Sequence, residues 1–405
     1  MTDLPRVGVV CAGVLKEVPE QEKHDFDVLE KLVGANTGNL AFTYPIDRLI
    51  DNSIEPIPWN FDIEKARERY DILWFACANM IGSHAELGWV ADHLEAAGLP
   101  VIAVGLGAQS RSITNMNVSI QPGTLRWLKV VERLSASESN IFCRGEYTDS
   151  ILKLHHISHS QSGCCPSLFI SSNPALGATI FKNRHDPEYN QQPFAVYSGF
   201  IGNKSLYPLE QSLARLIDHH SPNGIYISQH GGTLLRLSEQ RFHEQLSDNE
   251  IASAKTMILP MASNDEFLQW CQLHMRAFYS LDTWIDTIKS YRFACGMRFH
   301  GTMVSLQAGT PSLCITIDSR TEEMCKSCMV PSMNAFEFSS VNPSVLYRVF
   351  DVRYKAQKFD ENRASKAREF ISFLTANNLS PSLHLQKIAS GSGDSADVPE
   401  LQLAG

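Results

Sequence analysis

Two cationic side chains, Arg298 and His300, stand where an apolar run gives way to a short helical pattern. Residues 291–297 are typical of a buried strand, and residues 302–308 indicate a helix that ends at Gly309. The amino end of a helix carries about half a positive charge, so nearby cations are repelled unless an anion binds beside them. The spacing therefore predicts an anion-binding site at this junction.

Further polar residues follow other apolar runs, at the places where strands are expected to end. Arg144 follows the run 141–143, and a glycine-rich stretch with Gln109 follows the run 100–104. His230 follows another such run, 225–228, after one intervening residue. Ligands of open α/β sheets bind beyond the carboxyl ends of the strands, so these side chains could share one site. Because arginine offers two parallel hydrogen bonds to a carboxylate or phosphate, the pattern favours a small polyanion.

Each of these signals also has an ordinary structural explanation. Arginines after strands are often surface residues, and Arg298 with His300 could instead form a salt bridge to an acid such as Asp318. The glycine-rich stretch lacks the spacing of a dinucleotide-binding loop. Cys325 and Cys328 form a single C-x-x-C pair, and no second pair of Cys or His stands near it. We therefore predict no metal site.

Short apolar runs alternate with amphipathic segments along most of the chain. Strands are predicted at 7–11, 72–77, 100–104, 141–143, 194–197, 225–228, 257–259, 277–280, 293–297 and 312–317. This alternation is typical of parallel sheets with helices on both faces. We predict two Rossmann-like α/β domains, with the following division: 1–182, a linker at 183–192, a second domain with a helical tail at 193–388, and a disordered end at 389–405.

Size and charge restrict the classes of function. The chain has 405 residues, of which 43% are hydrophobic, and a formal net charge of -9. The acidic balance argues against the basic surface that nucleic-acid binding requires, so an anion site must be local. The start of the chain lacks the pattern of a secretory signal, and no stretch is apolar over the length of a membrane span. Ten scattered cysteines fit a reducing compartment, and we predict a cytoplasmic protein.

The stretch RFHGTMVSLQAGTP, which begins at Arg298, resembles the signature of the polysaccharide pyruvyl transferase family. The similarity continues through IDSRTEEM, and the earlier pieces NTGN, DILWFACANMIG, VIAVGLGAQ and FCRGEYTDS resemble other elements of the family in the same order. Together they cover the chain from about residue 6 to residue 330. Two positions depart from the family's pattern. Gly145 stands where the family has Asp, with Glu146 one place later, and Asn39 replaces another Asp.

The resemblance implies a GT-B-like arrangement of two Rossmann-like domains with a cleft between them. It also implies an enzyme of exopolysaccharide biosynthesis. Such an enzyme transfers the pyruvyl unit of phosphoenolpyruvate onto two hydroxyls of one glycan sugar, giving a cyclic ketal and phosphate. Phosphoenolpyruvate would be the missing anion, as a co-substrate, and no cofactor is implied. The acceptor could be an oligosaccharide, a polysaccharide or a lipid-linked glycan met through peripheral membrane contact.

This chemistry suggests roles for the residues at the strand ends. Arg144 and Arg298 would hold the carboxylate and phosphate, with the amides of Gly301 and Thr302 as further donors. His300 would donate a proton to the methylene carbon or to the departing phosphate. A carboxylate such as Glu146 or Asp149 would be the candidate to deprotonate a hydroxyl. Other residues expected at the cleft or acceptor site are Asn36, Asn39, Asn79, Gln109, Glu146, His230, Asp318 and Arg320.

Two other functions stay open on the sequence. A GT-B glycosyltransferase would grip the diphosphate of a nucleotide sugar with the same cations, and the fold alone does not separate the two enzymes. A non-catalytic carbohydrate-binding relative would keep the fold without the reaction. The presence of Arg144, Arg298 and His300 disfavours this relative, and the changes at Asn39 and Gly145 keep it open.

Overall fold

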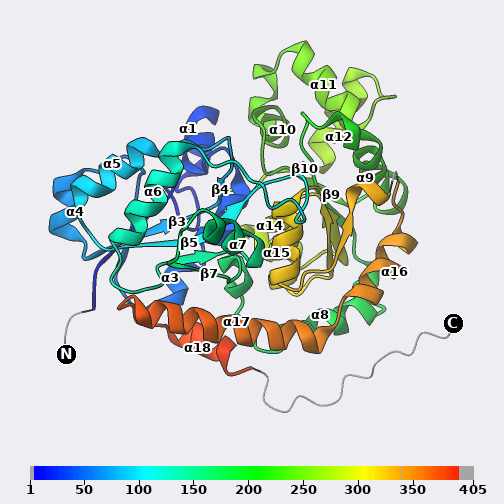
Figure 1. Cartoon of the computed structure of the whole chain (residues 1–405). Coiled ribbons are helices and arrows are strands. Elements are labelled where there is room, and N and C mark those ends of the chain that lie inside the picture. The colour runs from blue at the N-terminus through cyan, green and yellow to red at the C-terminus, as the bar shows by residue number, and fades with distance from the viewer. Residues whose placement is uncertain (1–3, 339, 392–405) are drawn as a thin grey trace.

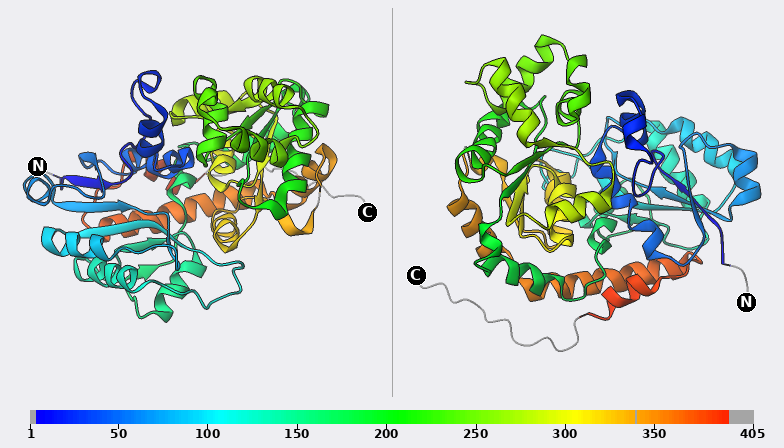
Figure 2. Two further views of the ribbon diagram at one scale, coloured as in Figure 1. Left: turned by 90° about the horizontal axis from the view of Figure 1, so that it is seen from above. Right: turned by 180° about the vertical axis from the view of Figure 1, so that it is seen from behind.

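The computed structural model describes residues 4–338 and 340–391, which form two α/β domains lying side by side (Figure 1, Figure 2). Each domain has a parallel sheet with helices packed on both of its faces. This arrangement confirms the fold class predicted from the alternation of apolar and amphipathic segments.

The first sheet has seven parallel strands, β1 (Val7–Val10), β2 (Ile54–Ile57), β3 (Ile72–Ala76), β4 (Asn79–Ile81), β5 (Val101–Ala108), β6 (Ile141–Cys143) and β7 (Ser160–Gln161). Their order is β2-β1-β3-β5-β6-β7, and β4 pairs with β5. The second sheet has six, β8 (Phe194–Tyr197), β9 (Ile225–Ile227), β10 (Met275–Arg276), β11 (Phe293–Gly296), β12 (Ser312–Thr316) and β13 (Ser332–Asn334). Their order is β10-β9-β8-β11-β12-β13.

The helices before β8 are α1 (Phe26–Leu32), α2 (Leu40–Thr43), α3 (Ile46–Leu49), α4 (Ile63–Arg69), α5 (Gly88–Ala97), α6 (Pro122–Arg133), α7 (Glu146–Leu154) and α8 (Leu176–His185). After β8 come α9 (Tyr207–His220), α10 (Gly232–Ser238), α11 (Asp248–Ile258), α12 (Asn264–His274), α13 (Leu281–Ile288), α14 (Phe299–Gln307), α15 (Ser319–Ser327), α16 (Pro343–Arg353), α17 (Ala356–Ala376) and α18 (Leu383–Ala389). Short 3₁₀ helices are η1 (Gln21–Lys23), η2 (Thr37–Asn39), η3 (Pro166–Phe169), η4 (Tyr189–Gln191), η5 (Lys204–Leu206), η6 (Gln240–Gln245) and η7 (Ala335–Glu337). Among the described helices, none is long and apolar enough to cross a membrane.

Strand β3 shows how the first sheet is buried on both faces. Leu73 and Phe75 pack with the apolar residues of α4, α5, α6 and α7, whereas Trp74 and Ala76 point to the opposite side. Successive side chains of a strand alternate between the two faces, so a strand covered on both sides must be apolar throughout. This requirement explains why β3 was recognisable as a continuous apolar run.

The helical tail packs under the first sheet, although the sequence suggested that it belongs to the second domain. Helix α17 runs beneath both domains (Figure 1). Its Phe370 ring lies 6.1 Å from that of Trp74 in β3 and 4.8 Å from that of Phe142 in β6. Asp360 of α17 accepts hydrogen bonds from the amides at the start of α8, which itself occupies the beginning of the predicted linker 183–192. The tail therefore joins the two domains.

Two strand predictions in the second domain were wrong. Residues 257–259 belong to the end of α11, which a capping box between Ser247 and Glu250 initiates. The apolar side chains of Met257 and Ile258 pack into the core from this helix, so a buried helix end was mistaken for a strand. Residues 277–280 follow β10 rather than forming it. The prediction of a disordered end at 389–405 falls mostly outside the described residues.

Candidate active site

A cleft of about 1320 Å³ opens between the two domains, at the carboxyl ends of both sheets. Its walls are formed by residues that follow β3, β5 and β6 in the first domain and β8, β9, β11 and β12 in the second. Of the residues predicted from the sequence, those that line the cleft are Asn36, Asn39, Asn79, Gln109, Arg144, His230, Arg298, His300, Asp318 and Arg320. The cleft between two domains is thus present as predicted.

Arg298 is the N-cap residue of α14 and is held by the backbone of the segment after β8. Its Nε donates to the carbonyl oxygen of Ser198 at 3.2 Å, and its Nη2 donates to that of Gly199 at 2.9 Å. These acceptors fix the guanidinium without neutralising its charge. Burial, together with the positive charge of Arg320, lowers the pKa of Arg298 to about 10. The side chain is therefore a positioned cation in a poorly solvated place.

Asp318 does not form the salt bridge with Arg298 that the sequence left open. Instead its Oδ2 lies 3.3 Å from Nη2 of Arg320 and accepts a hydrogen bond of 3.1 Å from Nε2 of Gln109. Its Oδ1 caps α15 by accepting from the Thr321 amide at 2.9 Å. Asp318 thus forms its ion pair with Arg320, and its charge acts on Arg298 only from a greater distance.

Arg144 brings a second cation from the first domain. It is almost fully buried, its Nε donates to the Gly105 carbonyl at 2.7 Å, and its Nη2 has no hydrogen-bond partner. Burial lowers the pKa of its guanidinium. In the described part of the chain, no carboxylate lies within ion-pair distance of Arg144 or Arg298. The charges of Glu323 and Glu210 act on Arg144 and Arg298, respectively, from beyond that distance, so each cation is only partly offset.

His300 is the second residue of α14 and lies half-buried in the cleft wall. Its Nε2 is 3.6 Å from Sγ of Cys165, and its ring centroid is 5.4 Å from that of Phe42. Burial holds the pKa of His300 well below its usual value, and the charges of Arg144 and Arg320 lower it further. His300 is therefore neutral unless negative charge arrives beside it.

Amide side chains connect the two walls of the cleft. Asn79 after β3 donates to Gln109, which in turn donates to Asp318 of the second domain. Asn36 caps η2 by accepting from the Gly38 amide at 2.9 Å, and Asn39 donates to the Val33 carbonyl at 2.9 Å. Asn36 and Asn39 therefore hold the backbone of the wall in place and also line the cleft.

His230 also lines the cleft. Burial, followed by the charges of Arg298 and Arg320, lowers its pKa below the usual value of 6.5. Its Nδ1 is buried without a hydrogen-bond partner. The ring is therefore neutral, and its Nδ1 is enclosed by the surrounding protein.

Three of the predicted residues lie away from the cleft surface. Glu146 is exposed and lies 3.4 Å from Lys326, outside the cleft. The Gly301 backbone packs so tightly against Tyr197 and Gln229 that any side chain there would collide with them. Thr302 is fully buried, and its amide donates to the Arg298 carbonyl at 3.1 Å inside α14. The Thr302 amide is therefore not available to a ligand, because the helix begins three residues earlier than predicted.

The carboxylate of Asp149 is also unavailable. It accepts hydrogen bonds from Lys153 and Ser160, at 2.6 Å and 2.7 Å, and does not line the cleft. Neither acid proposed from the sequence as a base for the acceptor hydroxyl, Glu146 or Asp149, is thus in place for that task.

The sequence did not single out several residues that help to build the site. Arg111 follows the glycine-rich stretch and lines the cleft, as do Phe200, Asn203 and Phe336. Arg111 could have been found from its place two residues after Gln109, at a strand end. The others gave no signal, because isolated Phe and Asn residues in loops are common. Cys165 lies 135 positions before His300 in the sequence, so no local pattern indicates that the two side chains meet.

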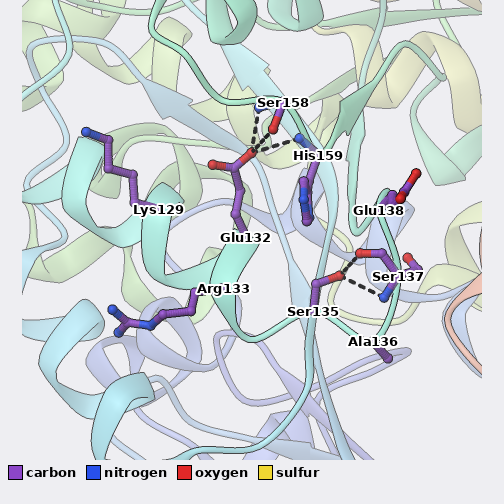
Figure 3. Close-up of a pocket in the computed structure, with 9 residues that line it drawn as sticks. All are labelled: Lys129, Glu132, Arg133, Ser135, Ala136, Ser137, Glu138, Ser158 and His159. Atoms are coloured by element: carbon purple, nitrogen blue, oxygen red, sulfur yellow. Dashed lines mark hydrogen bonds between the residues drawn. The ribbon is translucent and has the colours of Figure 1, made fainter.

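A second depression, of about 630 Å³, lies at the opposite end of the first sheet, beside the segment that leads into β6 (Figure 3). Glu132 there accepts hydrogen bonds from the Ser158 and His159 amides, and Ser135 accepts from the Ser137 amide. Several of its polar groups thus bond to one another, although His159 Nδ1 is buried without a partner. Among the described residues, no group of three or more His, Cys, Asp or Glu side chains is arranged to hold a metal ion.

Comparison with known proteins gives one match by sequence. The family model described as polysaccharide pyruvyl transferase matches residues 36–319, which include both walls of the cleft. No curated protein matches the sequence.

Solved structures are similar at low identity. The UDP-N-acetylglucosamine 2-epimerase from Rickettsia bellii is 12% identical, with 93% of this chain and 97% of that chain covered and a TM-score of 0.42. Anabaena Alr3699/HepE in complex with UDP-glucose is 10% identical, with 95% of this chain and 98% of that chain covered and a TM-score of 0.42. A putative UDP-N-acetylglucosamine 2-epimerase from Listeria monocytogenes is 9% identical, with 91% and 96% covered and a TM-score of 0.43.

Proposed function

The chain belongs to the polysaccharide pyruvyl transferase family, and from this premise we propose that it transfers the pyruvyl unit of phosphoenolpyruvate to a glycan sugar. Two hydroxyls of that sugar form a cyclic ketal, and inorganic phosphate leaves. The observation that supports this reaction best is a pair of cleft cations with no carboxylate in ion-pair distance, the buried Arg144 of the first domain and the half-buried Arg298 of the second. A small donor with a carboxylate and a phosphate would supply negative charge to both.

The reaction balances with the donor and a diol alone. One hydroxyl oxygen bonds to C2 of phosphoenolpyruvate while C3 gains a proton and becomes a methyl group. The C2–O bond to phosphate then breaks, and the neighbouring hydroxyl forms the second C2–O bond. Of the two hydroxyl protons, one replaces the proton delivered to C3 and the other leaves with phosphate. We therefore propose phosphoenolpyruvate as a co-substrate and no further cofactor.

The residues of the cleft suggest a role for each step. Arg144 and Arg298 hold the carboxylate and the phosphate, and the first amides of α14, at Phe299 and His300, can add hydrogen bonds. His300 is neutral beside these arginines, but a bound dianion offsets their field and raises its pKa. The imidazolium formed in this way can protonate C3 or the departing phosphate.

His230 is our candidate for removing a proton from the acceptor hydroxyl. It lines the cleft, and its depressed pKa keeps the imidazole neutral and able to accept a proton. Because Nδ1 is enclosed by the protein, Nε2 is the nitrogen that we propose for this contact. This assignment replaces the carboxylates Glu146 and Asp149, which lie outside the cleft.

The test is phosphate release from phosphoenolpyruvate in the presence of a panel of glycosides, with mass spectrometry of the products. We expect a product with one added pyruvate ketal. Separate Arg298→Ala and His300→Asn variants should lower kcat/KM by at least about a hundredfold. The control is His219→Asn, an exposed residue of α9 that does not line the cleft, which should keep wild-type activity. Wild-type activity in folded Arg298→Ala, or a product with an added hexose, would rule out the proposal.

A further inference from the structure

Two aromatic rings stand exposed in the wall of the cleft. In the part of the chain that the structure describes, three Phe or Trp side chains are largely exposed, Trp89 at 51%, Phe200 at 47% and Phe336 at 66%. Phe200 and Phe336 both line the cleft, whereas Trp89 does not. Large exposed apolar side chains concentrated in a polar cleft usually mark a binding surface.

The local backbone fixes the place of both rings. Phe200 follows β8, its carbonyl accepts a hydrogen bond of 2.9 Å from the Asn203 amide, and its ring packs over Gly202, where a side chain would collide with it. Phe336 lies in η7, where its amide donates to Oδ1 of Asn334 at 2.9 Å. The exposure of these rings is therefore a feature of ordered segments.

Polar groups surround the Phe200 ring. Its centroid is 5.7 Å from that of His230, and the two rings meet edge to face. Asn203 and Ser205 line the cleft beside it. The wall thus offers an apolar surface bordered by hydrogen-bonding side chains, and the guanidinium of Arg298 lies beside it, bonded to the carbonyl of Gly199, the residue before Phe200.

An aromatic ring bordered by hydrogen-bonding side chains favours an uncharged ligand that has an apolar face and polar groups at its edge. The face of an aromatic ring carries negative electrostatic potential, so it does not attract a phosphate or a carboxylate. A pyranose ring presents an apolar face of C–H groups and an edge of hydroxyls, which match the ring and the polar side chains respectively. The aromatic rings and the arginines of the cleft therefore suit different substrates, which would lie next to each other.

We propose that Phe200 and Phe336 belong to the acceptor subsite and bind the glycan through the apolar faces of its neutral pyranose rings, with Asn203, Ser205 and His230 beside the hydroxyls of the sugar on Phe200. This inference rests on the proposed function, because it assigns the second substrate of the same cleft. It places the hydroxyl that reacts near His230, the group proposed to accept its proton.

Steady-state kinetics can separate the two substrates. Phe200→Ala and Phe336→Ala should each raise the KM for the acceptor roughly tenfold and leave the KM for phosphoenolpyruvate unchanged. Phe200→Trp and Phe336→Tyr should recover most of the acceptor affinity, whereas Leu at either position should recover less, because a leucine has no flat face. Trp89→Ala is the matched control, since it removes an exposed ring outside the cleft.

Direct binding gives a result that does not depend on turnover. Saturation-transfer NMR with neutral methyl glycosides should show contact through the C–H protons of one sugar face in the wild type and a weaker signal in both Ala variants. If the Ala variants bind and use the acceptor as the wild type does, the inference is wrong. If the wild type releases no phosphate with any acceptor, the proposed function fails, and the NMR comparison still decides whether this subsite binds sugars.

Discussion

Arg320 affects several titratable groups of the cleft at once. Its Nη2 lies 3.3 Å from Oδ2 of Asp318, and its positive charge lowers the pKa values of Arg298, His230 and His300. Arg320 Nε is itself buried without a hydrogen-bond partner. One side chain therefore contributes to the protonation state of both histidines that the proposed mechanism uses.

We predict that Arg320→Gln raises the pKa of His300 towards its usual value of 6.5. Removing a positive neighbour stabilises the imidazolium, and the carboxylate of Asp318, freed from its partner, acts in the same direction. An NMR titration of the imidazole C–H signals measures this pKa. Arg111→Gln is the control, because Arg111 lines the same cleft but is not a cause of the shift. If the pKa of His300 is the same in Arg320→Gln as in the wild type, the charge of Arg320 is not a cause of its shift.

At the scale of elements, the start of α14 shows what the sequence could and could not predict. The strand, the helix and the junction between them were all predicted from apolar periodicity, and Arg298 and His300 were found for that reason. The helix boundary was wrong by three residues, because the sequence before Thr302 contains no Ser, Thr, Asp or Asn to mark an N-cap. This error assigned the donor role to Thr302 rather than to Phe299.

Contacts between distant elements were beyond the sequence analysis. The N-cap of α7 is Gly145, which has no side chain to accept a hydrogen bond from the first turn of the helix. The carboxylate of Glu323 in α15 accepts this hydrogen bond instead. Glu323 Oε1 accepts from the Thr148 amide and Oε2 from the Thr148 hydroxyl, both at 2.7 Å. The two residues are 175 positions apart, and no local pattern relates them. Glu323 fills the space that a side chain at position 145 would need.

We predict that Glu323→Ala destabilises the protein by about 2 kcal/mol or more, because the start of α7 loses its cap and a buried hydroxyl loses its acceptor. Thermal unfolding monitored by circular dichroism measures the loss. Glu322→Ala, an exposed neighbour on the same helix, should have little effect. Adding Gly145→Asp to Glu323→Ala should restore stability, since the vacated space admits an N-cap side chain on an extended backbone. Failure of this rescue, or an equal loss in Glu322→Ala, would show that capping is not the cause.

At the scale of the whole molecule, the two domains are held together on both sides of the cleft. On one side, the Ser110 amide donates to Oγ of Ser319 at 2.8 Å, and the Thr37 amide donates to the Gln229 carbonyl at 2.8 Å. On the other, α17 passes under both domains (Figure 2). The sequence predicted the helical tail but not its place, since an amphipathic helix does not indicate which sheet its apolar face will cover.

Phe370 is the residue by which the tail holds the first domain. Its ring packs against those of Trp74, Phe142 and Phe169, with centroids 6.1, 4.8 and 5.7 Å away, and it is fully buried. We predict that Phe370→Ala lowers the free energy of unfolding by about 3–5 kcal/mol, as expected for a large cavity in a packed core.

Because α17 spans both domains, chemical unfolding of the wild type should follow one transition, whereas unfolding of Phe370→Ala should follow two. Val352→Ala, a half-exposed position on α16, serves as the control and should leave both the midpoint and the single transition unchanged. A variant that loses stability but keeps one transition would mean that the tail is only part of the first domain's core, and that contacts around the cleft alone couple the domains.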